Sequence, residues 1–101
     1  MSDDDEFPED IWLIEGHDGR SKFFETRVST MSQYHMRLLL QQLAARHLTP
    51  QQIVDATTAR TNDLEIDELP APDKRVTLGT RGNPRYVAAL YQSHELKRLR
   101  R

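Results

Sequence analysis

The sequence predicts an α+β fold in which a small antiparallel sheet, a β-hairpin with a possible third strand, packs against three helices in the order β-β-α-α-(β)-α. Runs of β-branched and aromatic residues flank an Asp-Gly turn signal near the N-terminus. Later segments begin with helix-capping residues and continue with apolar residues three and four apart. A chain of 101 residues allows one such domain with a modest core.

The hairpin is expected over residues 10–28. Placing Asp18-Gly19 at a two-residue turn sets Glu15 opposite Lys22 and Ile14 opposite Phe23. The same register sets Asp10 opposite Arg27 and Leu13 opposite Phe24. Pairs of opposite charge and pairs of apolar side chains both stabilise hairpins, so turn chemistry and pairing favour one register.

Two helices are expected to follow, over residues 30–47 and 50–59. Thr30 and Gln33 have the spacing of a capping box at the start of the first helix. Its buried stripe is expected to contain Met36, Leu39, Leu40 and Leu43. Thr49, Pro50 and Gln52 provide the N-cap, first position and capping box of the second helix.

The last third of the chain is expected to contain a linker, a short strand and a third helix. Residues 60–74 are acidic and contain prolines, with a short edge strand possible at 64–66. Val76-Thr77-Leu78 is expected to form a strand. Asn83 and Pro84 then favour the start of a helix. Its expected apolar stripe comprises Tyr86, Val87, Leu90, Tyr91 and His94.

The charges divide the chain into an acidic start and a basic end. Residues 1–10 carry six acidic side chains, whereas residues 81–101 carry six basic ones and one acidic one. We expect residues 1–9 to be disordered and residues 10–101 to form a single α+β domain. The two ends are either simply solvated, bound to something anionic, or attracted to each other. The N-terminus lacks the pattern of a secretion signal and no apolar run could span a bilayer, so a cytoplasmic protein without membrane contact is expected.

Few patterns in the sequence point to catalysis. There is no cysteine, and the four histidines are not spaced as metal ligands on a helix. The serines lie in no nucleophile elbow, and Gly79-Thr80-Arg81-Gly82 is too short for a phosphate-binding loop of the P-loop type. That segment is either a plain turn or a weak anion site. We therefore expect no enzymatic activity, no catalytic or metal-binding residues and no cofactor.

The remaining function classes are protein binding and nucleic-acid binding. A non-catalytic binding or regulatory protein, acting through a protein partner or as a homo-oligomer, is favoured because no convergent polar set is found. The alternative is a nucleic-acid-binding regulator that uses a basic C-terminal helix or a corner at 36–59 resembling a helix-turn-helix. In the competing interpretation the corner is simply two core helices that meet at a capped turn. Its second helix carries Asp55 but no basic residue, which disfavours contacts with DNA phosphates. The candidate anion or nucleic-acid contacts are Arg81, Arg85, Lys97, Arg98, Arg100 and Arg101.

Overall fold

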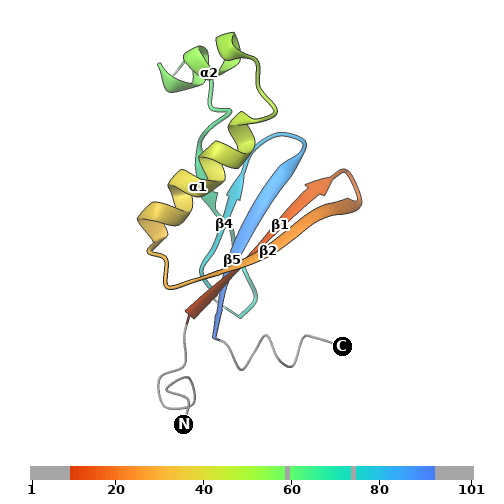
Figure 1. Ribbon diagram of the computed structural model, residues 1–101, viewed down its shortest axis with the longest axis vertical. Coiled ribbons are helices and arrows are strands. Elements are labelled where there is room, and N and C mark those ends of the chain that lie inside the picture. Colours follow the sequence, from red (N-terminus) through yellow and green to blue (C-terminus); the bar gives the residue numbers. More distant parts are fainter. Residues whose placement is uncertain (1–9, 59, 74, 93–101) are drawn as a thin grey trace.

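The structure, a computed structural model, describes residues 10–58, 60–73 and 75–92. Strands dominate this part of the chain, which contains five strands and two helices. Their order is β-β-α-α-β-β-β, which confirms the α+β class but not the number of helices. All five strands form one antiparallel sheet in the order β2-β1-β5-β4-β3, with α1 packed on one face of it and α2 beyond its end (Figure 1). The elements are β1 Asp10–Asp18, β2 Ser21–Ser29, α1 Gln33–Ala45, α2 Pro50–Thr57, β3 Ile66–Glu68, β4 Thr77–Thr80 and β5 Arg85–Gln92.

The core lies between α1 and one face of the sheet. Alternate residues of a strand point to opposite faces, and in β1 the inward ones, Trp12 and Ile14, are fully buried. The Trp12 Nε1–H donates to the Met31 carbonyl oxygen over 2.7 Å, which satisfies its one polar atom. Helix α1 packs on β3, β4 and β5. The buried residues that meet at this layer are Trp12, Ile14, Met36, Leu40, Leu78, Tyr86 and Ala88.

The third helix that the sequence predicts does not form, because residues 85–92 are strand β5. Asn83 and Pro84 lie in the turn between β4 and β5 instead of capping a helix. Every residue from Tyr86 to Tyr91 is apolar, so the run fits a helical stripe but equally suits a strand that has neighbours on both sides. Strand β5 is such a strand, since it pairs with β1 and with β4.

The predicted hairpin is confirmed, but its register is wrong. Asp18 pairs with Ser21, so the turn residues are Gly19 and Arg20 rather than Asp18 and Gly19. Gly19 has a φ of 64° and is the first central residue, as in a type II′ turn. A bulge follows at Phe23. His17 pairs with Lys22 and Gly16 pairs with Phe24, so Phe23 has no pairing partner in β1. The observed pairs beyond the bulge are Gly16 with Phe24, Glu15 with Glu25, Ile14 with Thr26, and Leu13 with Arg27.

The helix pair forms close to where the sequence predicts it. Helix α1 begins after Ser32, whose Oγ accepts from the His35 backbone N–H, and not after Thr30, which has a φ of 55°. In α2 the predicted cap is confirmed, because Thr49 and Gln52 form a reciprocal capping box. No residue of α2 is buried, and the helix lies beyond the end of the sheet rather than on it (Figure 1).

Candidate functional site

The sheet face opposite the helices is covered by neither α1 nor α2, and its centre is apolar. Residues 11, 13 and 15 of β1 point to this face because Trp12 and Ile14 point to the other one. In the register of β1 with β5, Ile11 lies opposite Tyr91 and Leu13 opposite Ala89. These side chains are half-buried by one another and by their neighbours. We call this set the open face; its apolar members are Ile11, Leu13, Val87, Ala89 and Tyr91.

Charged groups border the open face, and one of them is stacked on it. The guanidinium carbon of Arg75 lies 3.9 Å from the centre of the Tyr91 ring. Arg75 Nη1 donates to the Leu90 carbonyl oxygen over 3.0 Å, and Arg75 Nε donates to Asp73 over 2.9 Å. The stack is therefore fixed from three directions. A flat, rigid Arg–Tyr pair of this kind is typical of binding surfaces, where tyrosine and arginine are enriched.

Of the predicted contact residues, the structure describes Arg81 and Arg85. Arg81 makes a two-pronged ion pair with Asp67 over 2.8 and 2.9 Å, and it also contacts Glu65 at 3.1 Å. The hydrogen bond from Arg81 lowers the pKa of Asp67. Arg85 lies at the start of β5, where its guanidinium also contributes to the low pKa of Asp67. An anion at this place would have to compete with carboxylates already bound to Arg81. Lys97, Arg98, Arg100 and Arg101 lie outside the described residues.

A small polar hollow of about 220 Å³ lies where the end of α1 meets the β4–β5 turn. His47 Nε2 and the Tyr86 hydroxyl are 2.7 Å apart there, and Phe23 packs edge-on against Tyr86. Asn83 joins the turn to the hairpin, because its Oδ1 accepts from the Gly19 N–H over 3.0 Å. The sequence gives no sign of these contacts, which join residues more than thirty positions apart. These contacts join the β1–β2 hairpin, the end of α1 and the β4–β5 turn. Within the described residues there is no cluster of three metal-ligating groups.

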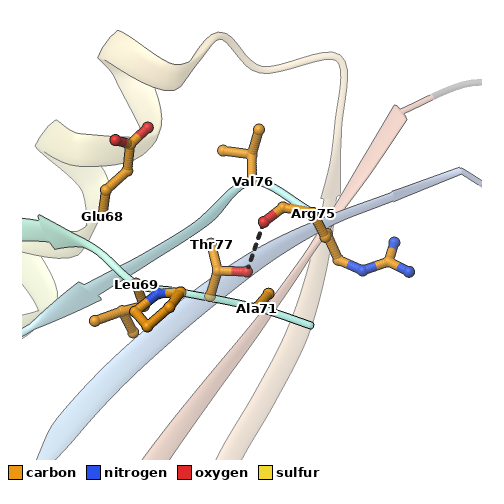
Figure 2. A pocket seen from close by; sticks show the side chains of 7 residues that line it. Glu68, Leu69, Ala71, Arg75, Val76 and Thr77 are labelled. Carbon is orange, nitrogen blue, oxygen red and sulfur yellow. Dashed lines mark hydrogen bonds between the residues drawn. The ribbon is translucent and has the colours of Figure 1, made fainter. Parts of the chain in front are cut away.

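Another hollow, of about 490 Å³, lies beside the connection from β3 to β4. Figure 2 shows that the Arg75 guanidinium points away from its centre, where the Thr77 hydroxyl donates to the Arg75 carbonyl oxygen over 3.2 Å. Glu68 is the one acidic residue among those that line it. Arg75 is the other ionisable side chain among the described residues that line it, and its guanidinium is already bound to the Leu90 carbonyl oxygen and to Asp73. Its lining residues are Glu68, Leu69, Pro70, Ala71, Arg75, Val76 and Thr77.

The outer edge of the sheet at β2 is a second candidate surface, because backbone N–H and C=O groups on that side have no partner strand among the described residues. Strand β2 is nine residues long and pairs only with β1 in the part of the chain that the structure describes. Most of its side chains are exposed. The other edge, β3, is only three residues long. A long unpaired edge offers backbone N–H and C=O groups to a further strand, so β2 is the stronger site for strand addition.

Comparison with protein families, with curated proteins and with solved structures found no match to this chain. Neither helix among the described residues is long and apolar enough to cross a membrane.

Proposed function

We propose that this protein is a small non-catalytic binding or regulatory protein that acts through a protein partner or through self-association. The observation that carries the proposal is the open face, an apolar band on a sheet surface that neither helix covers. Burying apolar area is the main driving force of protein association, at roughly 25 cal/mol per Å². A partner that covers Leu13 and Val87 would complete a second layer on this sheet.

The groups around the band fit a protein partner better than a nucleic acid. The face carries Arg27 and Arg75, but also Glu15 and Asp67, so its charge is mixed. A nucleic-acid surface needs several phosphate contacts of one sign. An interface with a protein instead combines an apolar centre with a polar rim of both signs. Tyr91, held by the stacked Arg75, would serve as an aromatic anchor in such an interface.

The alternative, a nucleic-acid-binding regulator, is supported by the basic residues 97–101. In the β1–β5 register Asp10 lies directly opposite Gln92, so the acidic residues 1–9 and the basic residues 93–101 continue from neighbouring positions at one end of the sheet. The acidic residues would then compete with phosphates for the basic ones. We therefore expect the intact chain to bind DNA and RNA weakly, on the order of 10⁻⁴–10⁻⁶ M.

One experiment separates the two classes. The wild type, Leu13→Lys and the matched control Leu38→Lys, which changes an exposed position on α1, are used to capture partners from native lysate with and without nuclease. A protein captured by the wild type and by Leu38→Lys, lost with Leu13→Lys and insensitive to nuclease, supports the proposal. Capture that nuclease abolishes contradicts it.

A titration with duplex and single-stranded oligonucleotides at two salt concentrations completes the test. It uses the intact chain and a chain lacking residues 1–9. Tight, salt-sensitive binding by the intact chain would replace the proposal with the nucleic-acid alternative. Binding that appears only after removal of residues 1–9 would show that the acidic residues compete for the basic ones. Absence of binding by both chains agrees with a protein partner.

A further inference from the structure

We propose that two copies of this chain pair through their β2 edges, antiparallel and about a two-fold axis at Thr26, so that their two sheets become one. This inference rests on the proposed binding function and names a second copy as the partner. It follows from three properties of β2: the direction of its free backbone groups, the order of its charges and the faces on which its side chains lie.

The direction of the backbone groups restricts the possible registers. The Thr30 backbone N–H donates to the Asp10 carbonyl oxygen, and hydrogen-bonded and non-bonded pairs alternate along an antiparallel ladder. Val28, Thr26 and Phe24 therefore direct their backbone groups toward β1. The N–H and C=O groups of Glu25 and Arg27 point to the outer edge. A second β2 can bond only if these odd-numbered residues meet odd-numbered residues of the other copy.

Three central registers satisfy this condition, and their charges separate them. A two-fold axis at Glu25 puts that carboxylate opposite its own copy, and an axis at Arg27 does the same with two guanidinium groups. Like charges directly opposite each other destabilise a strand pair. An axis at Thr26 instead places each Glu25 opposite Arg27 of the other copy. This register makes two opposite-charge pairs, and each pair also exchanges two backbone hydrogen bonds.

The side chains on the helix side of β2 fit the same register. With the axis at Thr26, Phe24 of each copy lies opposite Val28 of the other, and the two threonines face each other. Phe24 and Val28 are half-buried against the core and Thr26 is exposed, so pairing covers apolar surface that one copy leaves partly open. Helix α1 packs on β3, β4 and β5, which lie toward the opposite edge of the sheet from β2 (Figure 1).

Charged side chains on an edge strand usually prevent pairing between sheets. Here they select one register, because the two central charges are of opposite sign and two residues apart. Glu25 is held by an ion pair with Lys22 of its own strand, which lowers its pKa. Within the described residues Arg27 forms no close ion pair, and its charge adds only a minor part to the lowered pKa of Glu25 in the same strand. It is therefore available to a carboxylate of another copy.

The test is a charge exchange measured by sedimentation velocity over a wide range of concentrations. The wild type should dimerise reversibly. In a Glu25→Arg homodimer, arginine at position 25 faces arginine at position 27 of the other copy. In an Arg27→Glu homodimer, two glutamates face each other in the same way. Each variant alone should therefore weaken self-association about tenfold or more, because like charges repel across the strand pair. A mixture of these two variants restores both opposite-charge pairs and should form a heterodimer. Arg20→Glu, a charge reversal in the exposed turn, is the matched control and should dimerise like the wild type.

Amide hydrogen exchange locates the contact. In the wild-type dimer the amides of Glu25 and Arg27 should exchange slowly, and in the single variants they should exchange at the rate of an open edge. A monomeric wild type, or single variants that associate as tightly as the wild type, would overturn the pairing. In that event, capture of a protein that depends on Leu13 would still support the proposed binding function, whereas loss of both results would reject both inferences.

Discussion

Three leucines of α1 offer a graded test of the core, because they share chemistry and helix but differ in burial. Leu40 is fully buried, Leu43 is half-buried against the core and Leu38 is 40% exposed. Leucine to alanine removes three carbons, worth about 2.4 kcal/mol at roughly 0.8 kcal/mol for each buried group, and a cavity adds to this at a rigid site. We expect Leu40→Ala to lower the free energy of unfolding by about 3–5 kcal/mol.

The other two substitutions should cost less in the order of their burial. Water can fill part of the space that the half-buried Leu43 side chain leaves, so Leu43→Ala should lower the free energy of unfolding by about 1–2.5 kcal/mol. The exposed Leu38 should lose less than about 1 kcal/mol on change to alanine. Because a small domain has only about 5–15 kcal/mol of stability, the first change should be evident in a urea titration followed by circular dichroism. Equal losses for Leu40→Ala and Leu38→Ala would refute the assignment of the buried face.

Three further results are expected. Asn83→Ala removes the acceptor of the Gly19 N–H and should cost about 1 kcal/mol in a urea titration; an unchanged midpoint would mean that this contact contributes nothing. Gly19→Ala forces a β-carbon into a φ of 64° and should cost about 1–2 kcal/mol, while Gly19→Asn should cost less; equal losses would contradict the turn geometry. The pKa of Asp67 is lowered in the folded state by Arg81, so its contribution to stability is present above the unfolded pKa of about 4 and is lost as the pH falls through the folded pKa. The stability difference between the wild type and Asp67→Asn should therefore shrink in acid, and a difference that stays constant with pH would argue against the ion pair.

Local signals in the sequence predict those parts of the fold whose bonds are local. The capping box of α2 joins residues three apart, and its prediction is confirmed. The hairpin is predicted for the same reason, but its register is wrong because the turn lies at Gly19 and Arg20 and a bulge follows at Phe23. Phe23 packs on Tyr86, more than sixty positions away, and no local signal reports such a contact.

Strand β5 shows the opposite case, in which a local signal is misleading. Asn83-Pro84 and the apolar spacing after it satisfy the rules for a helix start. Pairing with β1 along the whole strand and with β4 at Val87, Ala88 and Ala89 overrides that preference because it satisfies the backbone groups of a central strand. The candidate surfaces depend on this strand. Since Val87, Ala89 and Tyr91 share a face only when residues 85–92 are extended, the open face is invisible to a helical interpretation.

The position of β5 also governs how the chain can fold. It is the last described strand to be synthesised, yet it lies between β1 and β4 and alone connects the β1–β2 hairpin with the β3–β4 pair. Its pairing of Gln92 with Asp10 closes nearly the whole described chain, and contacts between such distant residues slow folding. Until residues 85–92 have left the ribosome, the inner edges of β1 and β4 have no partner. A nascent or truncated chain that ends before Arg85 therefore exposes two open edges, and we expect it to aggregate rather than wait in a partly folded state.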